Sequence, residues 1–142
     1  MTTLKMLLDG KGHDVWSVHP DDTVLDAIKL LAEKDIGALI VIEDDKPVGI
    51  FTERDYARKV YLRGRSSLET AVRDIMVAPV VCARPDQTIE ECMAVMTAKR
   101  FRHLPILDGD ELVGMVSIGD LVKSVISDQQ FTIEQLEQFI FM

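Results

Sequence analysis

Two short segments of the chain combine residue types that can do chemistry. Residues 49–55 and 114–120 both read Gly-x-x-(Thr or Ser)-x-x-Asp. If the hydroxyl residue begins a helix, the free N–H groups and partial positive charge of that helix end can hold a phosphate. The aspartate one turn later can accept hydrogen bonds from both hydroxyls of a ribose. The pattern therefore predicts a nucleotide clamp that is built twice.

A simpler interpretation of the same spacing needs no ligand. Thr52 with Asp55, and Ser117 with Asp120, stand three residues apart, as in a capping box that satisfies free backbone groups at the start of a helix. A cap does not explain the glycine that opens each segment, because glycine weakens a strand and its small size permits close approach of another group. The repeated glycine favours the ligand interpretation.

Positive charge is distributed unequally between the two motifs. Arg54 precedes the first aspartate, whereas Gly119 precedes the second. A guanidinium forms charge-assisted hydrogen bonds with phosphate, so we expect the first motif to gain more affinity from each added phosphate. Arg102 and Lys11 are alternative sources of charge for the second motif. A basic cluster before the second predicted hairpin could contribute or could be a solvated loop: Lys99, Arg100, Arg102 and His103.

The second motif belongs to a copy of the first at a spacing of 65 residues, since 114 − 49 = 65. A gap-free repeat over most of the chain indicates one supersecondary unit used twice. In a chain of 142 residues neither copy alone could bury much core, so we expect the copies to share one. The same spacing relates residues far from the motifs: Val15 to Val80, Pro20 to Pro85, Thr23 to Thr88, and Leu39 to Leu104.

Each copy predicts the element order β-α-β-β-α. A short β-prone run at 15–18 precedes a helix that begins at Thr23 and has apolar residues at a 3.6-residue period. Two apolar runs, 39–42 and 47–51, flank a polar turn and predict an antiparallel hairpin. A second helix then begins at Thr52. The fold class is therefore mixed α/β (α+β).

The domain organisation follows from the same pattern. We expect one module over 1–142, with repeat one at about 10–62, a polar linker at 63–67, and repeat two at about 75–127. Residues 128–142 predict a further amphipathic helix outside the repeat.

That last predicted helix has an apolar stripe made by Ile133, Leu136 and Ile140, and Thr132 has the residue type of an N-cap. Such a stripe would be an exposed patch unless something covers it. Either the helix closes the core of its own module or it forms a contact in a dimer with twofold symmetry.

Composition excludes several classes of protein. The formal net charge of −8 disfavours binding to nucleic acid, and no apolar run is long enough to span a membrane, so we expect a cytoplasmic protein. Cys82 and Cys92 lack zinc or disulfide spacing and are typical of small core residues. His13, His19 and His103 lie in separate segments, with no arrangement typical of a nucleophile and its base. We therefore expect no catalytic residues and no metal site.

The repeat order, the two motifs and the Pro-Asp-x-Thr segments at 20–23 and 85–88 resemble a tandem pair of cystathionine-β-synthase-type (CBS) domains. The resemblance covers nearly all of residues 10–127. It implies two repeats packed with pseudo-twofold symmetry and two clefts, in which the motif of one copy faces the first two strands of the other. Carried onto this chain, Thr52, Arg54 and Asp55 would face Val80, Val81, Arg102, His103 and Pro105, while Ser117 and Asp120 would face Val15, Trp16, Gly37 and Ala38.

Trp16 departs from the pattern, because the other copy has Val81 at the equivalent position. The indole could stack on a base or narrow that cleft.

The resemblance also implies a function. CBS pairs are regulatory modules that sense adenosine-containing ligands, so we expect an adenine nucleotide, AMP first, with ADP, ATP, NAD or S-adenosylmethionine as alternatives. The occupied state would be transmitted to an unidentified protein partner, and a homodimer is expected. The alternative is a structural interaction module whose clefts stay unoccupied.

Overall fold

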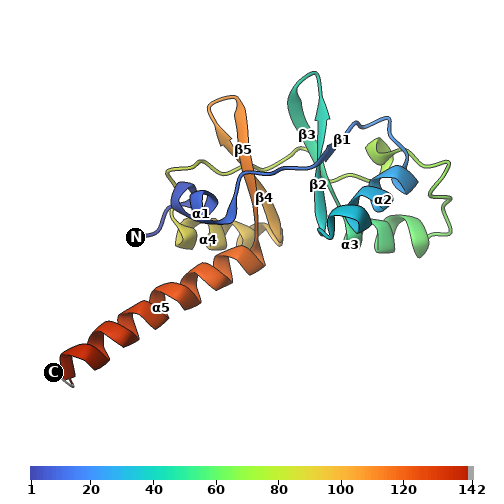
Figure 1. Cartoon of the computed structure of the whole chain (residues 1–142). Helices are drawn as coiled ribbons and strands as arrows, with labels where there is room; N and C mark the ends of the chain where they lie inside the picture. The colour runs from blue at the N-terminus through green and yellow to red at the C-terminus, as the bar shows by residue number, and fades with distance from the viewer. Residues whose placement is uncertain (141–142) are drawn as a thin grey trace. The chain divides into compact units, whose positions relative to one another are not determined.

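The computed structural model describes residues 1–140 and divides into two compact units. The first, which we call the inserted unit, is Asp14–Val81. The second, the outer unit, combines Met1–His13 with the chain from Cys82 onward. Figure 1 labels the elements, and residues 141 and 142 lie outside the described part of the chain.

The inserted unit contains a three-stranded sheet in the order β1-β2-β3. The strands β1 (Ser17–Val18) and β2 (Ala38–Glu43) are parallel, and helix α2 (Val24–Lys34) connects them. The hairpin of β2 and β3 (Lys46–Thr52) is antiparallel and leads into α3 (Glu53–Asp55), which continues as a π-helix, η1 (Tyr56–Tyr61). A short 3₁₀ turn, η2, follows at Val72–Asp74.

The outer unit repeats this arrangement with one strand fewer. Helix α4 (Ile89–Lys99) precedes the antiparallel hairpin of β4 (His103–Asp108) and β5 (Glu111–Ser117). The predicted first strand of this copy is reduced to a single parallel bridge between Ala83 and Ile106. Pro79 and Pro85 flank this stretch and have no backbone N–H to donate to a ladder.

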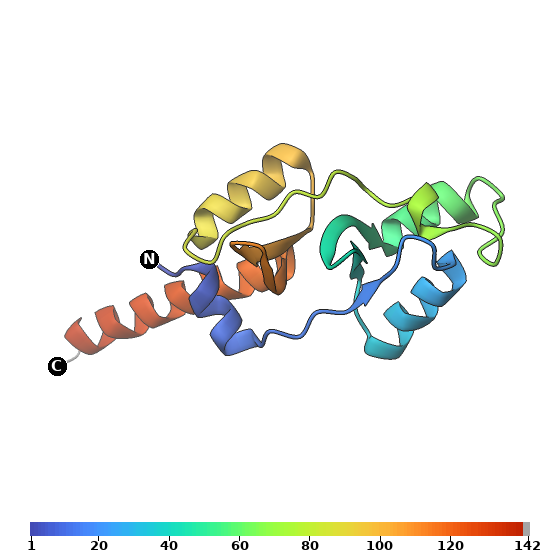
Figure 2. The same cartoon turned by 90° about the horizontal axis from the view of Figure 1, so that it is seen from above.

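Each unit is completed by a segment that comes before the other repeat in the chain. In the outer unit, helix α1 (Leu4–Lys11) contributes Leu4 and Leu8 to the core, and Thr3 bridges to Thr88 at the start of α4. In the inserted unit, the equivalent bridge joins Ala71 to Thr23 at the start of α2. Residues 1–13 and 71–77 thus have the same role in different units (Figure 2).

The predicted repeat architecture is confirmed, and both first helices begin where expected. Thr23 accepts a hydrogen bond from the N–H of Asp26, and Thr88 from that of Glu91. The inserted unit contains a core cluster made of its own residues: Val18, Val24, Ala27, Leu31, Leu39, Val41, Phe51, Val60, Val72 and Ile75. The expectation that the two copies share one core stays a prediction.

The predicted C-terminal helix is confirmed for residues 128–140, but the expectation that it is separate from the repeat is wrong. A single helix, α5 (Ile118–Ile140), begins directly after β5 and continues through residue 128 without interruption. The physical reason is that no glycine or proline follows Gly119, so nothing in the sequence ends the helix. Thr132, the expected N-cap, instead donates from Oγ1 to the carbonyl of Asp128 one turn earlier.

Within the described residues, no helix is both long and apolar enough to cross a membrane.

Candidate functional site

The first motif forms a complete capping box at the start of α3. Thr52 Oγ1 accepts a hydrogen bond from the backbone N–H of Asp55 at 3.2 Å, and the Asp55 carboxylate accepts one from the backbone N–H of Thr52 at 3.0 Å. The Thr52 hydroxyl also donates to the same carboxylate oxygen, Oδ2, at 3.0 Å. These bonds fix Asp55, whose side chain is only 10% exposed, in one orientation.

The second oxygen of Asp55, Oδ1, pairs with a lysine. Lys59 Nζ lies 3.2 Å from it and donates a further hydrogen bond to the carbonyl of Ile75 at 3.0 Å. Lys59 follows Asp55 by four residues, the spacing at which side chains on a helix meet. The first carboxylate is therefore held by its own helix from both sides.

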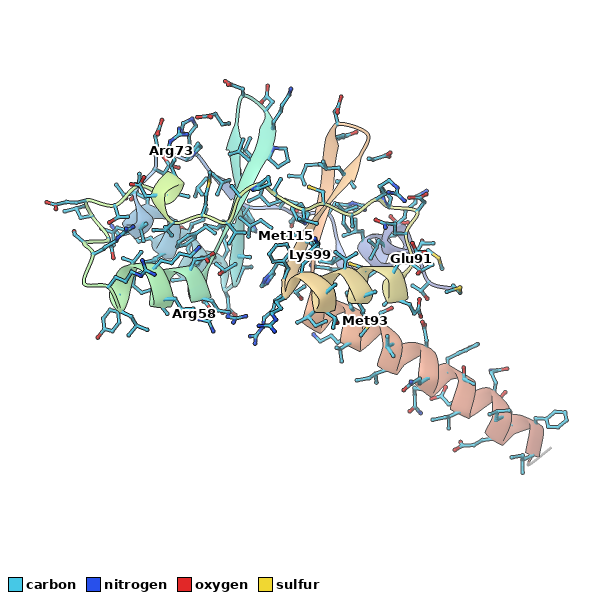
Figure 3. The ribbon with its side chains drawn as sticks, turned by 180° about the vertical axis from the view of Figure 1, so that it is seen from behind. Arg58, Arg73, Glu91, Met93, Lys99 and Met115 are labelled. Atoms are coloured by element: carbon cyan, nitrogen blue, oxygen red, sulfur yellow. The ribbon has the colours of Figure 1, made fainter. Side chains whose placement is uncertain are left out.

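The second motif has the same cap at the start of α5. The Ser117 N–H donates to Asp120 Oδ2 at 2.8 Å, and the Asp120 N–H donates to Ser117 Oγ at 3.1 Å. Its lysine comes from elsewhere in the chain: Lys11, at the end of α1, places Nζ 2.6 Å from Asp120 Oδ2 and 2.7 Å from the carbonyl of Met115. Figure 3 labels Met115 on its strand.

The different origins of the two lysines follow from the sequence. The residue that corresponds to Lys59 in the second copy, 65 positions later, is Ser124, which carries no charge. Lys11 supplies the missing cation from a point 109 residues away in the chain. No local sequence pattern predicts the contact of Lys11 with Asp120, whereas the four-residue spacing of Asp55 and Lys59 could have been found in the sequence.

Burial and neighbouring charges shift the pKa values of two groups at the second motif, Asp120 and His103. Burial works to raise the pKa of Asp120, but the hydrogen bonds from Lys11 and from the Ser117 backbone outweigh it, so this pKa lies below its ordinary value. Burial lowers the pKa of His103, and the positive charges of Lys11 and Arg102 lower it further against the opposing effect of Asp120. At neutral pH the motif thus holds a carboxylate and a neutral imidazole.

The glycines that open both motifs have a packing explanation that the sequence did not reveal. A Cβ on Gly49 would lie 2.7 Å from Met76 Sδ and 3.0 Å from the carbonyl oxygen of Val77. A Cβ on Gly114 would lie 2.7 Å from a methyl carbon of Leu8. Both glycines make room for the segment that completes their unit, so they are no longer an argument for a ligand.

The other predicted residues of the inserted unit surround the first motif in part. Ala38 pairs with Thr52 in the sheet, and the Gly37 carbonyl accepts a hydrogen bond from the N–H of Glu53 at 3.3 Å. Lys34 Nζ lies 4.1 Å from the centre of a Trp16 ring, in a cation–π contact. Val15, Val80 and Val81 are half-buried outside regular elements, and Arg54 is exposed in the first turn of α3.

In the outer unit, the predicted residues lie on β4 or just before it, beside the second motif. His103 pairs with Ser117, Pro105 pairs with Met115, and the Arg102 carbonyl accepts a hydrogen bond from the N–H of Ile118 at 2.8 Å. The structure therefore brings each motif together with strand residues of its own copy. The expected contacts between the motif of one copy and the strands of the other stay a prediction.

A separate cluster with metal-ligating side chains lies at the end of β2. His19, Asp21 and Glu43 each offer one ligand atom, and these atoms lie within 4.8 Å of one another. The guanidinium of Arg73, labelled in Figure 3, already bonds to Asp21 at 3.1 Å and to Glu43 at 2.9 Å. The arginine accounts for the proximity of the two carboxylates.

Comparisons with known proteins agree with the fold. A sequence model described as the CBS domain matches residues 12–61 and 72–127. The mitochondrial CBS domain-containing protein CBSX3 of Arabidopsis thaliana is 36% identical, over 98% of this chain and 72% of its own length.

Solved structures give the same result. A protein with CBS domains from Burkholderia ambifaria MC40-6 is 56% identical over 93% of this chain and 99% of the other, with a TM-score of 0.86. A CBS-domain pair solved in complex with 5′-methylthioadenosine and S-adenosyl-L-methionine is 22% identical over 90% of this chain and 98% of the other, with a TM-score of 0.79.

Proposed function

The chain belongs to the CBS-domain family, and from this premise we propose that it is a regulatory module that binds an adenosine nucleotide and transmits its occupied state to a partner protein. AMP is the expected ligand. ADP, ATP, NAD and S-adenosylmethionine present the same adenine and ribose diol. The ligands in the solved relative, 5′-methylthioadenosine and S-adenosyl-L-methionine, share this chemistry and support the class of ligand.

The observation that carries the proposal is the use of the carboxylate oxygens. In both motifs the cap occupies Oδ2 of the aspartate, through the N–H of Thr52 or Ser117. The cap therefore orients each carboxylate without using Oδ1. In Asp55 this oxygen pairs with Lys59 but has a second lone pair, so in both motifs Oδ1 can accept a hydrogen bond from a ribose diol. A phosphate beside either aspartate would meet the positive end of the helix dipole, although the carbonyls of Gly37 and Arg102 already accept the N–H groups of Glu53 and Ile118.

A second candidate function is favoured by the lysines. Because Lys59 and Lys11 pair with Asp55 and Asp120, both motifs are satisfied without a ligand. A structural interaction module with unoccupied sites would need nothing more. In either case we propose a non-catalytic role and self-association into a homodimer. Cytoplasmic location stays a prediction, since the name of the Arabidopsis relative places that protein in mitochondria.

Mass spectrometry of small molecules that co-purify with the protein, followed by calorimetric titration with AMP, separates the two candidates. Replacing both aspartates, Asp55→Asn and Asp120→Asn, should weaken AMP binding by about ten- to a hundredfold, because each site loses a charged acceptor. The fold should persist, since the amide oxygen of asparagine can still accept the hydrogen bond from the backbone N–H of Thr52 or Ser117. A folded double variant with unchanged AMP affinity contradicts the site, and a wild-type protein that binds no adenosine compound favours the structural module.

A further inference from the structure

Helix α5 is buried only where it begins. Leu121 in the first turn is fully buried and Val125 is half-buried, whereas the other large apolar side chains beyond Leu121 are between 41% and 77% exposed. Figures 1 and 2 show the helix extending past the other elements of its unit, and in Figure 3 the side chains of its outer half project into open space. The interpretation that this segment closes its own core is therefore wrong for the described residues.

The exposed apolar residues of α5 follow a heptad pattern. Successive members are separated alternately by four and three residues, which keeps them on one stripe of a helix, with isoleucine at every a position and Val122, Gln129 and Leu136 at the d positions. Phe139 lies beside this stripe at a g position, whereas Phe131 is at an f position on the opposite face of the helix. We call the stripe the α5 seam, and its members are Val122, Ile126, Gln129, Ile133, Leu136 and Ile140.

We propose that the α5 seam pairs with the same seam of a second copy as an antiparallel two-stranded coiled coil. The layers would be Val122 with Ile140, Ile126 with Leu136, and Gln129 with Ile133. This inference deepens the homodimer proposed above, by naming its surface and orientation, and does not depend on nucleotide binding. Gln129 is the single polar member, and one polar residue in a seam selects the register at a cost in stability.

Charge complementarity determines the orientation. Lys123 and Glu137 both occupy e positions of the heptad and stand 14 residues apart, since 137 − 123 = 14. In the antiparallel register Lys123 of one copy lies opposite Glu137 of the other, and twofold symmetry forms this pair twice. A parallel pairing places Thr132 opposite Glu137 and forms no ion pair. Antiparallel helices also align their dipoles favourably.

The first test uses the full chain and sedimentation equilibrium. Ile133→Glu places a charge in the seam and should convert the dimer to a monomer. Phe131→Glu is the matched control, because it makes the same kind of change two residues away, outside the seam, and should leave the dimer intact. Circular dichroism checks that both variants are folded. A dimer of unchanged affinity in Ile133→Glu overturns the proposed surface but leaves self-association standing, whereas a monomeric wild type overturns both.

The second test examines whether the two α5 helices are antiparallel, and it leaves the residues of the α5 seam unchanged. Lys123→Glu and Glu137→Lys should each weaken the dimer by about tenfold, because two ion pairs become two repulsions. The combined variant should recover most of the lost affinity. Glu134→Lys, on the outer face of the same helix, should change little. If both single variants are neutral while Ile133→Glu still dissociates the dimer, the antiparallel arrangement is wrong.

Discussion

At the scale of single residues, the two lysines determine which existing contacts a ligand would disturb when it binds to Asp55 or Asp120. Lys11 Nζ lies 2.6 Å from Asp120 Oδ2, in a pair that is partly exposed to solvent, and its positive charge makes the whole carboxylate, Oδ1 included, a weaker acceptor for a ribose diol. Partly exposed ion pairs contribute roughly 0.2 to 1 kcal/mol, so this opposing effect is modest. The contact joins α1 to the start of α5 and gives the second motif a cation that binding would disturb.

Removing that lysine should therefore strengthen binding at the second motif. In a protein whose first motif is disabled by Asp55→Asn, we expect Lys11→Met to raise adenosine affinity up to about fivefold, measured by calorimetry. Lys59→Met in the same background is the control and should have no effect, because its aspartate is already changed. A loss of affinity in Lys11→Met would mean that the ammonium holds the ligand instead of competing with it.

His13 gives a pH dependence that belongs to the outer unit. Its Nδ1 lies 2.8 Å from the Val113 carbonyl and its Nε2 lies 3.3 Å from Asp9 Oδ1, and both acceptors raise the pKa of the imidazole. The raised pKa means that the folded state binds the proton more tightly than the unfolded state. Its contribution is fully present below the unfolded value of about 6.5 and is lost as the pH rises through the folded pKa.

We therefore expect His13→Gln to lower the free energy of unfolding more at about pH 5 than at about pH 8, measured by urea denaturation. His19→Gln serves as the comparison at another histidine. An equal effect of His13→Gln at both pH values would contradict the proposed protonation.

At the scale of elements, the two motif glycines show how closely residues 1–13 and 71–77 pack on the hairpins of their units. Gly49 faces Met76 and the backbone of Val77, and Gly114 faces Leu8 of α1. Leu8 is almost fully buried, so its methyl groups have little space to move. Both hairpins therefore need a residue without a side chain at this position, because another segment packs directly against the backbone there.

Adding a methyl group at these glycines should destabilise the protein without any ligand present. We expect Gly49→Ala and Gly114→Ala each to cost roughly 1 to 3 kcal/mol in thermal or urea unfolding, as overpacking does in cores. Gly49→Ala should be the more severe, since the added methyl group meets the backbone carbonyl of Val77 as well as a side chain, whereas at Gly114 it meets the Leu8 side chain alone. Gly10→Ala, where nothing lies within 4 Å of the added carbon, should be neutral or slightly stabilising. A neutral Gly49→Ala would contradict the packing explanation.

The elements themselves were largely predictable, because each leaves a local signal. The periodicity after Thr23 and Thr88, their caps, and the apolar runs around polar turns identified the helices and both hairpins. Two helices were not recognised correctly. No helix was predicted before residue 15, and Gly10 has a low helix propensity, yet α1 continues through it because packing of Leu4 and Leu8 outweighs that cost. The prediction of a separate C-terminal helix depended on Thr132 as its N-cap. In the structure Thr132 lies inside the continuous helix α5 and bonds to the carbonyl of Asp128.

The candidate site was predictable only within each motif. The spacing of Thr52 and Asp55 predicted their bonds because a capping box is local. The contacts of Gly114 with Leu8 and of Asp120 with Lys11 connect segments about 100 residues apart, and no pattern in a single sequence encodes them. Proximity of this kind is set by the fold as a whole.

At the scale of the whole molecule, the repeat and the compact units do not coincide. The matched family segments run consecutively along the chain, at 12–61 and 72–127. The compact units are instead nested, since the chain starts the outer unit, builds the whole inserted unit, and then returns to finish the first. The order of the segments along the chain therefore differs from the order in which their contacts can form.

Because the units are nested, their contacts must form in a fixed order while the chain is being synthesised on the ribosome. The inserted unit is contiguous and has all its residues once Val81 is made, whereas α1 is synthesised before it and finds Thr88, Gly114 and Asp120 only afterwards. At about 5 to 20 residues per second, Lys11 waits roughly 5 to 20 seconds for Asp120. During that interval Leu4 and Leu8 have no core to enter, so α1 presents apolar side chains that a chaperone can bind.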